Sequence, residues 1–199
     1  MLAAIRLANE SDAQKMLSIY APLVRETPIS FEVEAPSEAE FRQRLIGNLE
    51  RMPWLVCEIE GELSGYAYAS SHRTRAAYQW CVESSVYIAA GHRKKGVGKA
   101  LYTSLFKLLQ LQGFYNVYAG ITLPNPASVA LHEAVGFELV GVYPLCGYKL
   151  DRWHDVGWWK LLLQQERSAS VHPPLLLSEV QNSVQWQEAL RSGLELLRS

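Results

Sequence analysis

Residues 86–101 read Val-Tyr-Ile-Ala-Ala-Gly-His-Arg-Lys-Lys-Gly-Val-Gly-Lys-Ala-Leu, a strand-like start followed by a basic turn. Apolar residues then recur at spacings of three and four, which predicts that a helix begins after the turn. A helix N-terminus exposes unpaired N–H groups, and Gly96 and Gly98 let the backbone approach a ligand closely. The turn can therefore cradle a pyrophosphate. The alternative is a tight turn whose Lys and Arg side chains are merely solvated.

Two other phosphate-binding motifs do not fit this turn. A Walker loop needs G-x-x-x-x-G-K-[ST], but counting from Gly91 puts Val97 in the lysine position. Counting back from Lys99 puts Arg93 in place of the first glycine. A dinucleotide fingerprint needs a third glycine where Leu101 stands. ATP hydrolysis and nicotinamide chemistry therefore lose support.

The rest of the chain mixes strand-like and helix-like segments. Hairpins combined with crossover helices predict an α/β fold, with a mixed sheet covered by helices. Helices are expected behind capping boxes at Ser11–Gln14 and Ser37–Glu40, over 97–112, and from Asn125-Pro126 to Gly136. Strands are expected at 5–7, 54–60, 63–70, 82–88, 115–122, 137–143 and 156–163.

Composition narrows the class of protein. The chain has 199 residues, a net charge of -1, and no apolar run long enough to cross a bilayer, so neither nucleic acid nor a membrane is expected as a partner. Its three cysteines are odd in number and widely spaced, which indicates neither a disulfide framework nor a metal site. We expect a cytoplasmic protein.

The chain is predicted to have three parts. Residues 1–164 form the main domain, residues 165–178 form a linker with two prolines, and residues 179–199 form a C-terminal amphipathic helix. That helix can pack on its own domain, on a partner subunit or on another protein.

The motifs resemble a known superfamily. Residues 93–98 match the [RQ]-x-x-G-x-[GA] motif of the GCN5-related N-acetyltransferases (GNAT), and residues 125–137 resemble their second cofactor motif. Residues 83–87, 101–103, 131–134 and 147–157 are similar to the branch of phosphinothricin and methionine sulfoximine N-acetyltransferases. The resemblance covers about residues 4–164. It implies the GNAT fold, with a mixed, mostly antiparallel sheet that splays open after the fourth strand.

The resemblance implies that acetyl-CoA binds in that gap as co-substrate, without a metal. The pantetheine arm would pair with the fourth strand, where a backbone N–H polarises the thioester carbonyl. Asn125 can be a pure helix cap, a ligand contact, or both. The implied cofactor residues are Val86, Tyr87 and Ile88 on the strand, Arg93, Lys94, Lys95, Gly96, Val97, Gly98 and Lys99 around the pyrophosphate, and Asn125 and Ser128 at the pantetheine.

Glu83 and His132 are the implied catalytic residues. A substrate amine must lose a proton before it attacks a thioester, and the carboxylate of Glu83 can accept that proton. His132 can protonate the departing thiolate or assist the base. The alternatives are a solvated strand glutamate and a helix-face histidine bonded to backbone. Tyr102, in the same region, is interpreted as a core residue.

The acceptor pocket is implied by analogy. It contains Phe31, Arg73, Ala76, Ala77, Tyr78 and Glu83, with Tyr148, Lys149 and Trp153 as further candidates. A guanidinium suits carboxylate or phosphinate oxygens, so Arg73 can grip an acidic amino acid, although ordinary solvation is the alternative. Members of this branch are commonly homodimers, and a homodimer is expected here.

The favoured function is acetyl-CoA-dependent acetylation of the α-amine of a small amino acid such as phosphinothricin or methionine sulfoximine. Transfer would be direct, in a ternary complex. Two alternatives stay open: a GNAT enzyme that acts on a different small amine, and a non-catalytic acetyl-CoA-binding module whose C-terminal helix docks a partner.

Overall fold

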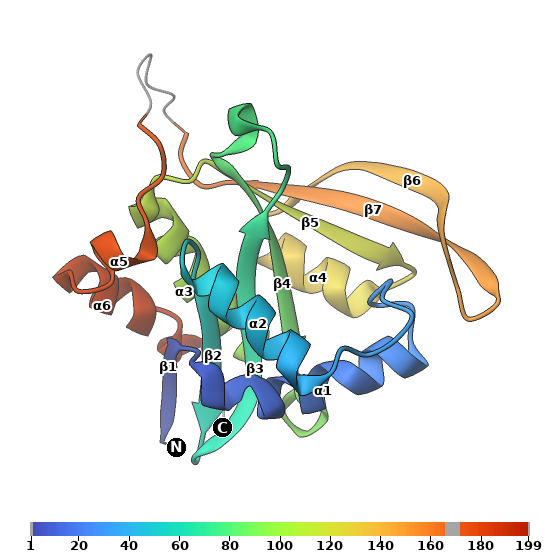
Figure 1. Ribbon diagram of the computed structural model, residues 1–199, viewed down its shortest axis with the longest axis horizontal. Helices are drawn as coiled ribbons and strands as arrows, with labels where there is room; N and C mark the ends of the chain where they lie inside the picture. The colour runs from blue at the N-terminus through green and yellow to red at the C-terminus, as the bar shows by residue number, and fades with distance from the viewer. Residues whose placement is uncertain (1, 166–171, 199) are drawn as a thin grey trace.

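Seven strands form one sheet in the order β1-β2-β3-β4-β5-β7-β6 in the computed structural model, which describes residues 2–165 and 172–198 (Figure 1). All neighbouring strands are antiparallel except β4 and β5, so the sheet is mixed, as expected. The strands are β1 (Ala3–Leu7), β2 (Trp54–Ile59), β3 (Glu62–Ser71), β4 (Cys81–Ile88), β5 (Asn116–Leu123), β6 (Glu138–Lys149) and β7 (Arg152–Leu162).

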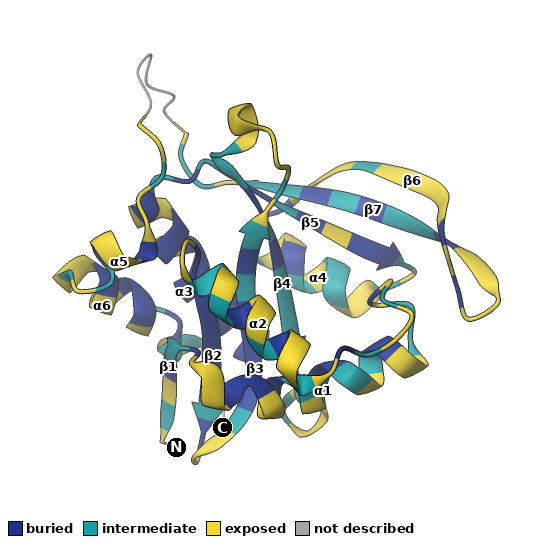
Figure 2. Cartoon of the chain, in the orientation of Figure 1, coloured by how far each residue is buried: buried dark blue, intermediate teal, exposed yellow. Residues whose placement is uncertain are grey.

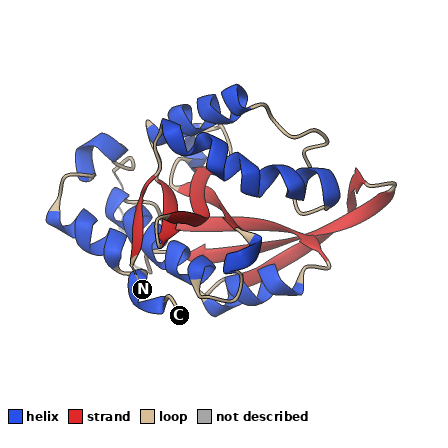
Figure 3. Ribbon diagram, turned by 90° about the horizontal axis from the view of Figure 1, so that it is seen from below, coloured by secondary structure: helices blue, strands red, loops and turns tan. Residues whose placement is uncertain are grey.

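Helices cover both faces of the sheet (Figure 3). On one face, α1 (Ala13–Glu26) and α2 (Glu38–Leu49) bury Met16, Phe41 and Leu45 against the aromatic side chains of β2 and β3. On the other face, α3 (Val97–Gln112) and α4 (Pro126–Ala134) cover a second, larger apolar cluster. The sheet is thus the middle layer of three, and β2 and the middle of β3 are mostly buried, whereas β4 is largely half-buried (Figure 2).

Local sequence signals account for most helix ends. The capping box from Ser37 to Glu40 forms, and Asn125 caps α4 with Pro126 in the first turn. The predicted capping box from Ser11 to Gln14 is wrong. A reciprocal cap forms between Asn9 and Asp12 instead and starts a 3-10 turn. The Asn9 side chain accepts from the Ser11 N–H, and the Asp12 carboxylate accepts from the Asn9 N–H at 2.8 Å. The α-helix therefore begins at Ala13.

The sheet opens between β4 and β5. The two strands pair in parallel at three positions, Cys81 with Asn116, Val82 with Val117, and Glu83 with Tyr118. Beyond these positions β4 runs on to Ile88 and β5 to Leu123, and the two strands diverge (Figure 1). The splay expected after the fourth strand is confirmed, and it leaves one side of β4 residues 84–88 without a strand partner among the described residues.

The β6–β7 hairpin is longer than the sequence pattern predicts. The strands expected at 137–143 and 156–163 extend to a turn at Leu150 and Asp151, both of which have positive φ. A register shift between Tyr143 and Gly147 interrupts the apolar-polar alternation, which hides the continuation of β6 from a periodicity analysis. β6 is the edge of the sheet, and most of its side chains are exposed (Figure 2).

The C-terminal segment does not form the single helix expected over 179–199. It consists of α5 (Leu177–Val180), α6 (Val184–Arg191) and a 3-10 turn at Leu194–Leu196. Ser183 starts α6 afresh, because its side chain accepts a hydrogen bond from the Trp186 N–H. Of the expected linker, residues 166–171 lie outside the described residues, and residues 172–176 run beside α3, where the Leu175 N–H donates to the Gln112 carbonyl.

This segment packs on its own domain. Trp186, Ala189 and Leu190 are buried in the same apolar cluster as α3. Within residues 2–165 and 172–198, we find no helix with the length and apolar character that spanning a bilayer requires.

Replacing Trp186 tests whether the segment shares the main core. We expect Trp186→Ala to lower the free energy of unfolding by about 3–5 kcal/mol, because a 1% exposed indole leaves a cavity in the common cluster. Val184→Ala, on the same helix but 70% exposed, is the matched control and should change it by less than about 0.5 kcal/mol. The measurement is urea unfolding of both variants. Equal midpoints for Trp186→Ala and wild type would mean that the segment folds separately.

Candidate active site

A cleft lies where β4 and β5 separate. It encloses about 60 Å³ and is lined from both strands, from α3 and from α4. Its lining residues are Ile29, Ser84, Ser85, Val86, Tyr87, Tyr102, Gly120, Ile121, Thr122, Asn125, Ser128 and His132. The opening of the sheet thus brings together residues that the sequence assigns to both cofactor binding and catalysis.

The basic turn before α3 has the form of an anion site. Gly96 is the N-cap of α3 in the left-handed region, with φ of 82°, and among the described residues no side chain caps this helix. The first N–H groups of α3 are therefore left for another acceptor. Lys94 also has a positive φ of 64°, a conformation that costs a non-glycine residue on the order of 1 kcal/mol and gathers at ligand-binding loops. The residues present fit a pyrophosphate.

Two of the three cofactor residues expected on β4 lie at the cleft. Val86 and Tyr87 line the cleft, whereas the side chain of Ile88 packs into the core beside Gly65. A Cβ on Gly98 would stand 2.8 Å from a methyl of Leu131, so a side chain there would push α3 and α4 apart. Arg93, Lys94, Lys95, Val97 and Lys99 surround Gly96 and Gly98 in the turn and the first turn of α3.

Asn125 and Ser128 sit at the start of α4. The Asn125 side-chain oxygen accepts from the Ser128 N–H at 3.2 Å, so the predicted capping role is confirmed. Both residues also line the cleft. A ligand contact for either stays a prediction.

His132 and Tyr102 form a buried pair at the cleft. Nδ1 of His132 lies 2.8 Å from the carbonyl of Ser128, and a carbonyl can only accept, so Nδ1 carries the proton. Nε2 is then the acceptor for the hydroxyl of Tyr102, 3.0 Å away. Burial lowers the pKa of His132, and it raises that of Tyr102. Tyr102 is a core residue, as expected from the sequence, since it is fully buried in the larger apolar cluster, and it also lines the cleft.

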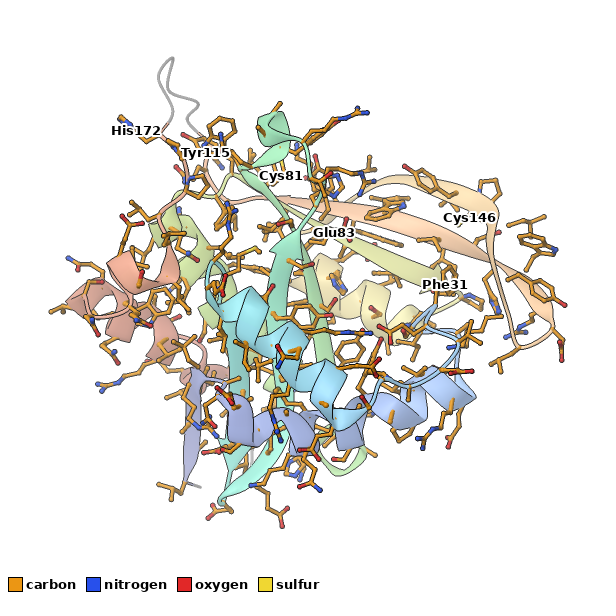
Figure 4. The ribbon with its side chains drawn as sticks, viewed as in Figure 1. Phe31, Cys81, Glu83, Tyr115, Cys146 and His172 are labelled. Carbon is orange, nitrogen blue, oxygen red and sulfur yellow. The ribbon has the colours of Figure 1, made fainter. Side chains whose placement is uncertain are left out.

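Glu83 stands at the last paired position before the sheet opens (Figure 4). Its Oε1 lies 2.8 Å from His72 Nδ1 and accepts from Arg73 Nη1 at 3.2 Å. The His72 ring stacks on Tyr118 at 4.5 Å with an interplanar angle of 17°. Sequence analysis missed His72. The signal that finds it is the β3–β4 register, since Ser70 pairs with Glu83 and residue 72 follows.

The expected acceptor residues do not gather in one pocket. Phe31, on the loop between α1 and α2, packs against Gly147 and the ring of His154 beside the β6–β7 hairpin (Figure 4). Ala76, Ala77 and Tyr78 are exposed in a 3-10 turn between β3 and β4, and Ala76 and Tyr78 line a second cavity together with Arg73. Arg73 alone of this set reaches Glu83.

Lys149 is a structural residue here, contrary to the suggested place in the acceptor pocket. Its Nζ donates to the carbonyls of Val24 and Ser30 at 2.5 and 2.6 Å, and the residue is 6% exposed. Burial lowers its pKa. Its ammonium ties the loop that carries Phe31 to β6. Tyr148 and Trp153 are exposed near the tip of the hairpin.

The buried imidazole of His132 should make the stability of the fold depend on pH. Its folded pKa lies below the ordinary 6.5, so the unfolded chain binds more protons in acid and stability falls as the pH drops below about 6.5. Between pH 7.5 and 5.5, we expect the free energy of unfolding of wild type to fall by up to about 1 kcal/mol more than that of His132→Gln. Urea unfolding of both proteins at each pH measures the difference. Parallel losses in the two proteins would contradict a neutral buried imidazole.

Comparisons with known proteins agree with this geometry. The Acetyltransferase (GNAT) domain profile matches residues 5–158. The phosphinothricin N-acetyltransferase of Streptomyces viridochromogenes is 41% identical over 78% of this chain and 85% of its own length. The L-methionine sulfoximine/L-methionine sulfone acetyltransferase of Pseudomonas aeruginosa is 35% identical over 85% of this chain and 99% of its own.

A solved structure extends the agreement to three dimensions. The GNAT superfamily phosphinothricin acetyltransferase from Sinorhizobium meliloti, in complex with AcCoA, superposes with a TM-score of 0.80. It is 36% identical, and the match covers 88% of this chain and 98% of that one. The matching profile, the relatives and the splayed sheet establish that this chain belongs to the GNAT family of acetyltransferases.

Proposed function

We propose that this enzyme transfers the acetyl group of acetyl-CoA to the α-amine of a small amino acid of the phosphinothricin and methionine sulfoximine type. The observation that carries the proposal is Glu83, held by two N–H donors at the point where the sheet opens. The names of the relatives, phosphinothricin N-acetyltransferase and methionine sulfoximine acetyltransferase, support this substrate class.

Acetyl-CoA supplies an activated thioester, and the chain's residues would hold it along the cleft. The uncapped N–H groups at the start of α3 would take the pyrophosphate, aided by the charges of Arg93, Lys94, Lys95 and Lys99. The unpaired edge of β4 at Val86 and Tyr87 would pair with the pantetheine arm as an added strand would. Asn125 and Ser128, which line the far side of the cleft, would complete the pantetheine site.

Glu83 would serve as general base through one particular oxygen. The partners of its carboxylate among the described residues, His72 and Arg73, both contact Oε1. Oε2 accepts no hydrogen bond from the described residues, so it is the atom left to accept the ammonium proton. The His72 ring is stacked on Tyr118 and bonds Oε1, so it would hold the carboxylate in one rotamer and keep Oε2 in one orientation. Direct attack by the freed amine follows, without a covalent acyl-enzyme.

The Tyr102–His132 pair would assist the departing thiolate. Burial raises the pKa of Tyr102, so its hydroxyl stays protonated and remains a donor. The hydroxyl donates to His132 Nε2 in this structure, and a rotation would let it donate to sulfur instead. His132 therefore acts behind Tyr102 in this arrangement, a role that the sequence left open between acid and assistant base.

Arg73 and Trp158 suit an acceptor with anionic oxygens. The Arg73 guanidinium lies 6.0 Å from the centroid of the Trp158 ring and next to Glu83. The indole Nε1 of Trp158 is buried without a hydrogen-bond partner among the described residues. A tetrahedral phosphinate or sulfoximine centre would offer oxygens to both donors. This arrangement favours an acceptor that carries anionic oxygens, such as an amino acid, over an amine without an acidic group.

A non-catalytic acetyl-CoA-binding module is disfavoured by two observations. Matched relatives are acetyltransferases over nearly their whole length. The C-terminal segment, which was to dock a partner in that alternative, fills this chain's own core.

We also propose a homodimer that works in the cytoplasm. The edge strand β6 exposes six apolar side chains, and an unpaired apolar edge strand is a ready site for pairing with another chain. Assembly through this strand would cover them. The cytoplasmic location rests on the three unpaired cysteines. The exposed set is Leu139, Val140, Val142, Tyr143, Leu145 and Tyr148.

One experiment tests the function and the base together. Wild type should acetylate phosphinothricin and methionine sulfoximine, measured by thiol release and by product mass. Glu83→Gln should lower kcat about 10²- to 10⁴-fold, because it removes the proton acceptor while keeping the shape. Its affinity for acetyl-CoA, measured by calorimetry, should match that of wild type.

The outcomes separate cleanly. An unchanged kcat in Glu83→Gln would reject the base and leave the activity standing. No product from either acceptor with wild-type enzyme that binds acetyl-CoA would reject the substrate class.

The dimer has its own test. Val140→Glu places a charge on a 61% exposed residue of β6 and should convert the dimer to monomer in size-exclusion chromatography with light scattering. Val184→Glu is the matched control, because Val184 is 70% exposed on α6, which packs beside β1 at the opposite edge of the sheet. A wild-type monomer, or dimers in both variants, would contradict assembly through this strand.

A further inference from the structure

The end of the C-terminal segment lies directly against the cofactor turn. The backbone N–H of Arg198 donates to the carbonyl of Lys95 at 2.9 Å. The carbonyl oxygen of Leu196 approaches Gly96 so closely that a Cβ there would stand 2.1 Å from it. A segment 100 residues away in sequence thus touches two consecutive residues of the basic turn, backbone to backbone.

The segment is fixed before it reaches the turn. A Cβ on Gly193 would stand 2.0 Å from the carbonyl of Ala100, so only glycine allows this approach to α3. The Ser104 hydroxyl donates to the Leu190 carbonyl at 2.8 Å and accepts from the Gly193 N–H at 3.2 Å. Trp186 anchors the preceding helix in the core. Residues 194–198 therefore follow directly after a part of the segment that is fixed on α3 and in the core.

The contact with Lys95 has a consequence for the neighbouring N–H group. The Lys95–Gly96 peptide is trans, since the one cis bond among the described residues is Leu123–Pro124. In a planar trans peptide, the carbonyl oxygen and the amide hydrogen point in opposite directions. A hydrogen bond that fixes the Lys95 carbonyl toward the C-terminal segment therefore directs the Gly96 N–H away from it.

We propose that Arg198, through its backbone N–H, is a positioning residue for acetyl-CoA: it holds the Lys95–Gly96 peptide so that the Gly96 N–H faces the pyrophosphate. The inference rests on the proposed function in one respect, the assignment of this turn to the pyrophosphate. It assigns a role to a segment that lies beyond residue 158, where the family profile ends. Lys94 and Gly96 on either side of Lys95 both have positive φ, and glycine adopts that region without strain, so a hydrogen bond to the Lys95 carbonyl helps to fix the orientation of this peptide.

A pair of substitutions isolates the N–H group. Arg198→Pro and Arg198→Ala both remove the guanidinium, but proline alone removes the donor. Leu197 has φ of -71° and ψ of 138°, an extended conformation that a following proline accepts. We expect Arg198→Pro to bind acetyl-CoA about 3- to 10-fold more weakly than Arg198→Ala by calorimetry, which is the range of one hydrogen bond.

Acetyl-pantetheine, which lacks the pyrophosphate, serves as the comparison donor. The two variants should have the same KM for acetyl-pantetheine, and their melting temperatures should agree within about 2 °C, because Arg198 lies at the exposed end of the segment. A chain that ends at Leu197 is a second variant without the donor and should resemble Arg198→Pro.

Three results would overturn the proposal. Equal acetyl-CoA affinities in the proline and alanine variants would show that the N–H does not matter. An equal penalty with acetyl-pantetheine would show general damage to the site. A wild-type enzyme that used both donors with the same KM would instead reject the pyrophosphate assignment, and with it the part of the proposed function on which the inference rests.

Discussion

β4 and β5 pair at three positions and then part, and the site depends on this short parallel ladder. If the ladder continued, the N–H and carbonyl groups on this side of residues 84–88 would pair with β5 and could not bind a ligand. The separation is held open by side chains from other elements, with Tyr102 of α3 and His132 of α4 filling the wedge behind it. The gap is therefore built into the packing of the chain's own side chains.

The charged groups follow the same geometry. Glu83 lies at the vertex of the wedge, where pairing with Ser70 and Tyr118 fixes its backbone on both sides. Its carboxylate is held in turn by His72 and Arg73, which follow directly after the end of β3 at Ser71. A strand-borne base with side-chain support is positioned more precisely than a residue on a loop, which suits proton transfer at a fixed distance.

Sequence signals of short range predicted most of the fold. Ser37, Asn125 and Gly113 mark helix ends through contacts within a few residues, and the structure keeps them. Contacts between distant elements could not be predicted. His72 meets Glu83 because of the β3–β4 register, and the sequence beside Lys149 gives no hint that its ammonium turns toward Val24 and Ser30.

Two separate constraints require glycine at position 96, one from its own backbone conformation and one from contact with the distant C-terminal segment. Its φ of 82° alone favours glycine, and a motif comparison explains it fully at that level. The carbonyl of Leu196 adds a second requirement, since any Cβ would collide with a backbone atom that the core holds in place. The family motif therefore accommodates an extension that lies outside the family's matched span. If the turn binds the pyrophosphate as proposed, the backbone that covers it leaves it fewer conformations to lose on binding, and this smaller entropy cost would favour the bound state.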